Sequence, residues 1–226
     1  LSRQEIRQVG LLGGFAELVS DLASKIRGDV SRDNIINLGN MSKISISMED
    51  DHNGIKASDI YWCKQNILTK HNIRESEDEA LVANIIIEIV TDKGYRISNI
   101  ELDLAYGKSL EDDDDKAKKR QQEIETKLTA YGAKRLEDEF LVVFNSIKSL
   151  ELQFRTKRAY IALFLAVYDL LFREQNIIDE TKVEQLKKTV ETTFARHVDT
   201  TQGGTWAKEN ITANIDVLKS AISKFF

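Results

Sequence analysis

A group of basic side chains in this 226-residue sequence has the type and spacing to bind phosphate. Arg155, Lys157 and Arg158 lie in the stretch FRTKR, directly before the most apolar segment of the chain. Arginine and lysine side chains hold phosphate groups, including those of nucleic acids, through charge-assisted hydrogen bonds. The alternative is a solvated basic turn whose cations pair with nearby acids or helix carbonyls. The pattern leaves both interpretations open.

A second candidate is the loop TTQGGTWAKEN, in which Gly203, Gly204 and Thr205 precede a predicted helix. A Gly-Gly-Thr loop at a helix start directs free backbone N–H groups outward, and such groups bind phosphate. The alternative is a plain interhelical loop, in which the glycines supply φ freedom and Thr205 is the N-cap. We favour the plain loop, because no lysine lies at the spacing that a P-loop requires.

At the start of the sequence, Arg3, Gln4 and Arg7 lie along one predicted helix, which a capping box of Ser2 and Glu5 would begin. Arg3 and Arg7 are neighbours of like charge at i and i+4, an arrangement that is mildly unfavourable in an isolated helix. An acidic group, from the protein or from a ligand, would relieve that cost. The sequence therefore predicts an acidic partner for this helix.

Other familiar catalytic and metal-binding patterns do not occur in the sequence. It lacks the P-loop, dinucleotide-binding, zinc-protease and nucleophile-elbow motifs. Consecutive acids in EDDDDKAKKR point in different directions on a helix, and the histidines are scattered, so we expect no metal site. Cys63 could meet His52 or His71 in space. A lone cysteine beside Trp62 is more often a small buried apolar residue.

The composition predicts an all-α globular protein. Hydrophobic residues make up 42% of the chain and charged residues 31%, which is enough to build a core. There is no proline, although about ten would be expected at average usage. A net charge of -5 argues against a protein that coats nucleic acid generally, but a local basic patch is compatible with it. The single cysteine fits a reducing compartment, so we expect a cytoplasmic location.

The sharpest change of composition divides the chain into two predicted parts. In EDDDDKAKKR, acids suit a helix N-terminus and bases follow one turn later. Residues 1–107 are predicted to form an irregular helical linker or middle region, and residues 108–226 a four-helix bundle. The segment from Tyr160 to Phe172 is apolar nearly all round but falls short of the roughly 20 residues that span a bilayer. We interpret it as a buried central helix and expect no membrane association.

Apolar side chains at helical spacing predict the remaining helices. One set ends before Gly28, a suitable C′ residue; a capping box of Ser76 and Glu79 begins another helix; and a short helix runs from Ser98 to Ala105. The alternating stretch KISISM is compatible with a short strand, which could not form a sheet alone. The predicted apolar sets are Phe15, Leu18, Val19, Leu22, Ala23 and Ile26; Phe140, Val143, Phe144, Ile147 and Leu150; Val183, Leu186, Val190 and Phe194; and Trp206, Ile211, Ile215, Leu218 and Ile222.

Several segments occur in an order that characterises a known family. They are LSRQEIRQ, GGFAELV, IRESEDEALVANI, FLVVFNSI, FRTKRAYIALFLAVYDLL and GGTWAKENITANIDVL, and they cover nearly the whole chain. In this order and spacing the sequence resembles the GmrSD-type restriction proteins, which join a ParB/sulfiredoxin-like amino-terminal domain to a helical region. The active motif of that family, D-G-Q-Q-R, lies upstream of the LSRQEIR helix and is absent from this sequence.

The resemblance implies a helical accessory region that braces or regulates a missing catalytic domain. In the intact protein that domain would depend on a nucleoside triphosphate and act on modified phage DNA. Arg3, Gln4 and Arg7 would then lie nearest to the missing domain. The alternatives are a DNA-binding or homodimerising helical module, and an enzyme whose site between the two parts uses Cys63, His71 and the acidic run. The sequence by itself does not decide among them.

Overall fold

The computed structural model describes residues 3–8, 13–28, 57–91, 98–108, 114–198 and 208–226. Every regular element within these ranges is helical and none is a strand, which confirms the predicted all-α fold. The α-helices are α1 Arg3–Gln8, α2 Gly14–Arg27, α3 Tyr61–Lys64, α4 Lys70–Arg74, α5 Glu77–Val90, α6 Asn99–Ala105, α7 Asp114–Tyr131, α8 Ala133–Ser149, α9 Lys157–Tyr168, α10 Val183–Thr193 and α11 Lys208–Ile222. Shorter 3-10 and π turns are η3 Ala57–Asp59, η4 Asp169–Arg173, η5 Glu180–Lys182, η6 Phe194–Val198 and η7 Ser223–Phe225.

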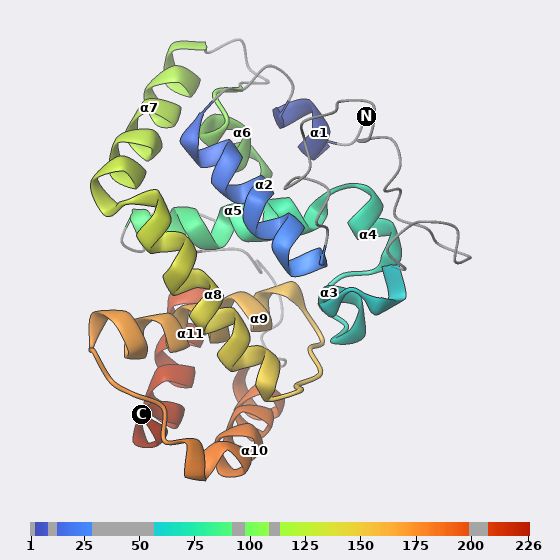
Figure 1. Cartoon of the computed structure of the whole chain (residues 1–226), viewed down its shortest axis with the longest axis vertical. Helices are drawn as coiled ribbons and strands as arrows, with labels where there is room; N and C mark the ends of the chain where they lie inside the picture. Colours follow the sequence, from blue (N-terminus) through green and yellow to red (C-terminus); the bar gives the residue numbers. More distant parts are fainter. Residues whose placement is uncertain (1–2, 9–12, 29–56, 92–97, 109–113, 199–207) are drawn as a thin grey trace.

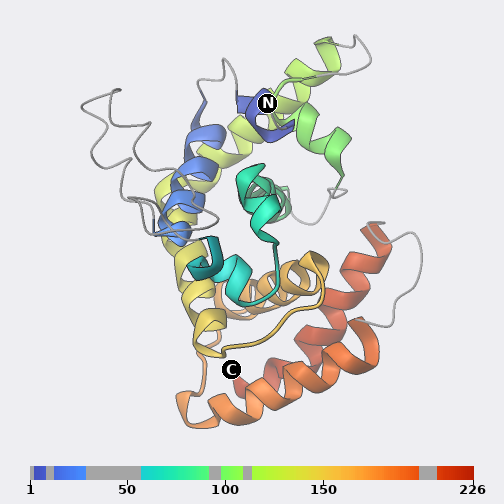
Figure 2. The ribbon, with the colours of Figure 1, turned by 90° about the vertical axis from the view of Figure 1, so that its right-hand side faces the viewer.

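Helix α5 crosses the middle of the molecule between two groups of helices (Figures 1 and 2). It packs on α1, α2, α6 and α7 of one group and on α9 of the other. Helices α7 and α8 follow each other along one side and join the two groups, separated only by Gly132. Gly132 has φ 94°, a value that favours glycine, so the chain can change direction there within one residue.

The helical bundle of the second group consists of α8, α9, α10 and α11. Helix α9 is its centre, because it packs on both α8 and α11, and α10 covers the outer side of α11. The predicted central position is confirmed: every residue from Arg158 to Leu170 is buried. Within the described part of the chain, the predicted apolar sets of α8, α10 and α11 are buried too, apart from a half-buried Val183.

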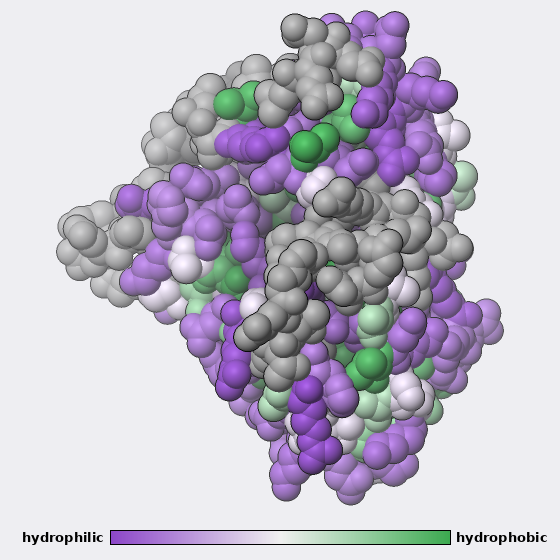
Figure 3. Space-filling model, turned by 180° about the vertical axis from the view of Figure 1, so that it is seen from behind, coloured by the Kyte–Doolittle hydropathy of each residue, from purple (hydrophilic) through white to green (hydrophobic). Residues whose placement is uncertain are grey.

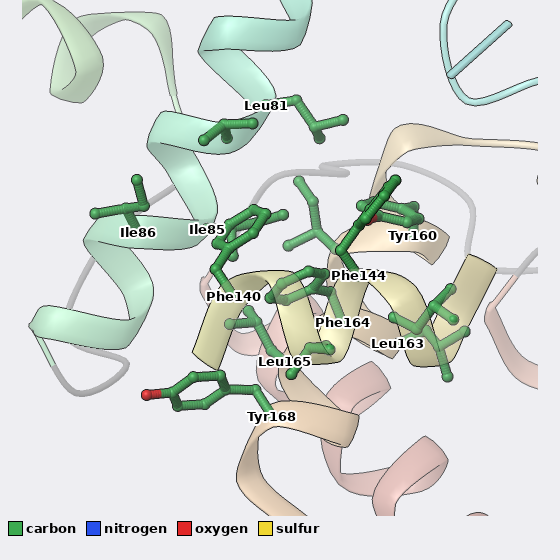
Figure 4. Close-up of a cluster of buried hydrophobic side chains, with 14 of the residues drawn as sticks. Leu81, Ile85, Ile86, Phe140, Phe144, Tyr160, Leu163, Phe164, Leu165 and Tyr168 are labelled. Carbon is green, nitrogen blue, oxygen red and sulfur yellow. The ribbon is translucent and has the colours of Figure 1, made fainter. Parts of the chain in front are cut away.

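One hydrophobic core extends through both groups. Figure 4 shows its centre, where Leu81 and Ile85 of α5 approach aromatic and leucine side chains of α8 and α9, while Ile86 lies on the opposite side of α5. The rings of Phe140 and Phe164 lie 4.5 Å apart between centroids. Helix α7 packs on α2, α5 and α6 as well as on α8, so buried contacts cross the position of the predicted division at residue 107. The division into 1–107 and 108–226 stays a prediction.

The local sequence explains where α2 begins and ends. Its apolar set from Phe15 to Ile26 is buried against α5, α7 and α8. Gly28 ends the helix in the left-handed conformation, with φ 76°, and its N–H returns to the Lys25 carbonyl at 3.1 Å. The predicted C-terminal stop is therefore confirmed. At the start of α6, the Ser98 hydroxyl accepts a hydrogen bond from the Glu101 N–H, which confirms the predicted start of the short helix.

The predicted capping box of Ser76 and Glu79 is wrong. Ser76 adopts a left-handed conformation with φ 57°, and its side chain makes no capping hydrogen bond. The turn is tight, because only Glu75 separates Ser76 from α4 and the Ser76 N–H donates to the Ile73 carbonyl. Glu79 cannot serve as the other half of the box, since its carboxylate reaches α2 and accepts a hydrogen bond from Arg27 at 3.4 Å.

Some sequence predictions fall outside the described residues. These are the capping box of Ser2 and Glu5, the stretch KISISM, the contribution of Trp206 and the loop with Gly203, Gly204 and Thr205. They remain predictions.

The surface of the described residues is mainly hydrophilic, as the view from behind shows (Figure 3). Large apolar side chains that are exposed occur singly on separate elements, and they are Ile6, Ile100, Val142, Ile177 and Val217. Across the described ranges, no helix combines the length and the apolar character that crossing a bilayer would need.

The structure predicts a steep dependence of stability on Phe164. Phe164→Ala removes a fully buried ring that contacts Phe140 and Tyr160, so we expect a loss of about 3–5 kcal/mol in the free energy of unfolding. Phe172→Ala is the matched control, because this ring is only half-buried and should cost clearly less. Urea denaturation followed by circular dichroism measures both, and equal losses would contradict the position of α9 at the centre.

Candidate functional site: the attachment of α1 and the cleft between α5, α6 and α9

The predicted acidic partner of α1 is Asp103 of α6. The Arg7 Nε donates to Asp103 Oδ1 at 2.7 Å, and Arg3 donates to both oxygens of the same carboxylate. The side chains of Arg7 and Asp103 are only 3% and 8% exposed, whereas that of Arg3 is 43% exposed. One carboxylate therefore neutralises the repulsion between the two arginines and fastens α1 to the body of the protein, which confirms the prediction.

Hydrogen bonds to uncharged groups complete this attachment. The guanidinium of Arg7 also donates to Gln4 Oε1 at 3.1 Å, to the Asn99 carbonyl at 3.0 Å and to Asn99 Oδ1 at 3.1 Å. Gln4 in turn donates to the Tyr106 hydroxyl at 3.1 Å. Burial raises the pKa of Tyr106 above its usual value, so the phenol stays protonated. Gln4 and Arg7 thus face α6, and of the three predicted residues Arg3 is the most exposed.

Sequence reasoning did not identify Asp103 as the partner. Arg7 and Asp103 are 96 positions apart, and no local pattern connects them. The available signal was an acidic residue within the short apolar helix NIELDLA, where a buried charge requires a partner. A role of Arg3, Gln4 and Arg7 toward another domain stays a prediction.

The three basic residues of FRTKR occupy different environments. Thr156 is the N-cap of α9, so Lys157 and Arg158 lie in its first turn. Lys157 donates to Glu77 Oε2 at 2.7 Å, Arg158 is only 8% exposed, and Arg155 is exposed. The cations therefore do not share one open face. Cations in a first turn are disfavoured by the helix dipole, and Glu77 offsets this for Lys157.

Lys157 borders a cleft of about 250 Å³ between α5, α6 and the start of α9. Both polar and apolar side chains line it. The lining residues are Glu77, Ala80, Leu81, Asn84, Ser98, Asn99, Leu102, Lys157 and Ile161. Lys157 is thus the basic residue of FRTKR that the structure brings to a cavity, and Asn99 connects the cleft to the attachment of α1.

Asn84 is the most unusual residue of the cleft. It is 8% exposed, and its amide nitrogen donates to the Ala80 carbonyl of its own helix at 2.8 Å. This bond fixes the orientation of the amide, because only the nitrogen can donate. The Oδ1 atom is buried and has no hydrogen-bond partner. A buried acceptor without a donor costs about 1–3 kcal/mol, so its presence requires an explanation.

The structure does not assemble the alternative catalytic site. His71 is largely exposed and pairs with Glu75 at 3.2 Å. Burial and the nearby charge of Asp78 raise the pKa of the Cys63 thiol, which disfavours the reactive thiolate. Neither residue lines the cleft. Within the described ranges, no group of three or more His, Cys, Asp or Glu residues is placed to hold a metal ion.

A buried carboxylate lies where α7, α8 and α9 meet. Glu139 accepts hydrogen bonds from the Tyr168 hydroxyl at 2.6 Å, from Arg135 Nε at 2.8 Å and from the Tyr131 hydroxyl. Burial alone would raise the pKa of Glu139, but the hydrogen bonds from Tyr131, Tyr168 and Arg135 outweigh it and hold the pKa below its usual value. Burial, together with the hydrogen bonds to Glu139 and Tyr131, raises the pKa of Tyr168. The ionised carboxylate of Glu139 therefore accepts hydrogen bonds from α7, α8 and α9, and these bonds link the two groups of helices.

The sequence matches no protein-family model, and no curated protein or solved structure is similar enough to count as a match.

We predict that Asp103 carries much of the stability of the α1–α6 attachment. Asp103→Ala leaves the buried charge of Arg7 without a counterion, so we expect a loss of about 3–5 kcal/mol in the free energy of unfolding. Arg3→Ala removes the more exposed partner of the same carboxylate and should cost at most about 1 kcal/mol. Urea denaturation measures both variants. Similar losses in the two variants would show that burial of the Arg7–Asp103 pair does not determine its contribution to stability.

The Glu139 joint predicts a specific pH dependence. Since the folded-state pKa of Glu139 is lowered, the ionised carboxylate stabilises the fold above the pKa of an ordinary glutamate, about 4.3. This contribution is lost as the pH falls through the lower, folded-state value. We expect Glu139→Gln to show a smaller loss of stability between pH 7 and pH 3 than the unchanged protein. Glu184→Gln, which changes an exposed carboxylate on α10, serves as the control in the same urea titrations.

Proposed function

We propose that this chain is the helical accessory region of a restriction-type protein that acts on modified phage DNA. In this proposal it braces or regulates a nucleoside-triphosphate-dependent catalytic domain and does not carry the reaction itself. The single observation that carries the proposal is the attachment of α1, in which Arg7 and Asp103 form a buried ion pair. We place this role in the cytoplasm, because a chain with a single cysteine has no internal disulfide and fits a reducing compartment.

The attachment suits a bracing role for a physical reason. A helix of six residues is too short to be stable alone, so tertiary contacts must hold α1 in place. The contacts with Asp103, Asn99 and Tyr106 hold it at several points on α6 and directly after it. A domain joined to such a helix would be held at a fixed orientation to the core. A displacement of α1 would have to break the Arg7–Asp103 pair. The attachment would then have two distinct states, one with this ion pair formed and one with it broken.

The family-like segments also coincide with the helices that build the core. RQEIRQ forms α1, GGFAELV begins α2, EDEALVANI begins α5, FLVVFNSI lies in α8 and KRAYIALFLAVY is α9. Helix α5 packs on α1, α2 and α9, and α8 packs on α9. The residues behind the resemblance are thus the ones that a shared helical scaffold would need, and this supports the proposal.

The first test is the activity of the chain alone. We expect hydrolysis of nucleoside triphosphates and nicking of modified or unmodified phage DNA to stay at the level of a buffer blank. A heat-unfolded sample of the same preparation controls for contaminating enzymes. Robust turnover that is lost when the protein unfolds would contradict a non-catalytic role. The reading frame upstream of Leu1 gives an independent check, because the proposal expects the D-G-Q-Q-R motif there.

A further inference from the structure

We propose that Asp78 makes the contact between α2 and α5 sensitive to pH: the contact is tight while the buried carboxyl group is neutral and loosens when the group ionises. Arg27 ends α2 and Asp78 is the second residue of α5, so their ion pair joins the end of one helix to the start of the other. Both helices can be followed in Figure 1. This inference does not depend on the restriction-type role, since it rests on this contact alone.

The carboxyl group of Asp78 is completely buried. Its side chain is 0% exposed, although aspartate is strongly hydrated when it is charged. Removing a carboxylate from water has a large cost in free energy, and this cost applies to the ionised form only. Burial at this position therefore favours the neutral carboxyl group.

Arg27 offsets this cost only in part. Its Nε lies 3.1 Å from Asp78 Oδ2, but among the described residues neither this nitrogen nor either carboxyl oxygen of Asp78 has a hydrogen-bond partner. The Nη2 of the same guanidinium lies 3.4 Å from Glu79 Oε1, so one positive charge acts on two carboxylates. A buried ion pair stabilises a fold only when hydrogen bonds of good geometry satisfy its polar atoms. The ionised form of Asp78 is thus poorly stabilised in this contact.

The surrounding charges agree with this balance. Burial raises the pKa of Asp78 above its usual value and the neighbouring Glu77 adds to the rise, whereas Arg27 and the N–H groups in the first turn of α5 act against it. The Cys63 thiol of α3 also faces Asp78. Other ionisable groups on elements packed near α5 have partners elsewhere, and they are Lys70 of α4, which acts on Cys63; Lys157 of α9, which pairs with Glu77; Arg7 of α1 and Asp103 of α6, which pair with each other; and Glu125 of α7, which accepts from the Phe15 N–H.

The direction of the pH dependence follows from the raised pKa. A carboxyl group whose folded-state pKa lies above the unfolded-state value, about 3.9 for aspartate, contributes stability that is fully present below the unfolded-state value. This contribution is lost as the pH rises through the folded-state value. Glu139 acts in the opposite direction, because its pKa is lowered. The sign of the effect therefore distinguishes Asp78 from Glu139.

Urea denaturation between pH 4 and pH 8 can compare the unchanged protein with Asp78→Asn, which keeps the size of the side chain but cannot ionise. We expect the ratio of their unfolding equilibrium constants, unchanged protein to variant, to rise by at least about fivefold over this range. Glu139 is common to both proteins, so its contribution cancels in the ratio. Glu184→Gln changes an exposed carboxylate of α10 and is the control, for which the same ratio should stay constant.

Two NMR measurements on the unchanged protein need no substitution. The ¹³C resonance of the Asp78 carboxyl group should titrate with a midpoint above the ordinary value of about 3.9. Amide hydrogen exchange reports on the contact itself. From pH 4 to pH 8 we expect the protection factors of residues 23–27 in α2 and 81–84 in α5 to fall relative to those of residues 186–193 in α10.

Three results would overturn the proposal. They are a carboxyl midpoint at or below about 3.9, a ratio of unfolding constants that does not rise with pH, and protection factors that do not fall in α2 and α5 relative to α10. The first would show that the contact stabilises the charged form of Asp78. The third would show that ionisation does not act locally. The first and third need no variant, so the proposal stays testable even if Asp78→Asn fails to fold.

Discussion

The fold depends on the need to bury two helices that are apolar on nearly every side. In α5 all residues from Asp78 to Ile89 are buried, and in α9 all residues from Arg158 to Tyr168. Such a helix cannot lie on a surface, so it must be surrounded. Helices α1, α2, α6 and α7 surround α5, α8 and α11 cover α9, and α5 and α9 also pack on each other. The single core therefore follows from the two most hydrophobic segments of the chain.

Several polar side chains are buried on these otherwise apolar helices and on their neighbours. A charge or amide on a buried helix must find a partner or pay for its desolvation. Asp103 finds two arginines, and Glu139 finds two tyrosines and an arginine. Asp78 lies against Arg27, although burial still raises its pKa. The Oδ1 of Asn84, a residue at the α5–α6–α9 cleft, is an exception, because it is buried and has no partner.

The sequence predicts elements well and long-range partners poorly, for physical reasons. Helical spacing identifies which face is buried, so the apolar sets of α2, α8 and α11 and the central place of α9 follow from it. Caps are less certain, because the Ser76–Glu79 pattern is overridden when Glu79 turns to Arg27 of a distant helix. An acidic partner for Arg3 and Arg7 follows from their repulsion, yet its identity depends on how α1 packs on α6. The cleft could not be predicted, since its polar residues come from three separate segments and only Lys157 among them was a candidate binding residue.

Asn99 belongs to two arrangements at once. Its carbonyl and Oδ1 hold Arg7, and the same residue forms part of the wall of the cleft. If a molecule bound in the cleft and stabilised one position of α1, then a shift of α1 to another position would weaken the binding of that molecule by the same free energy. A substitution at Asn99 would disturb both sides of this balance. Substitutions at residues that belong to one arrangement alone change it without touching the other: Arg3 belongs only to the attachment of α1, and Asn84 only to the cleft.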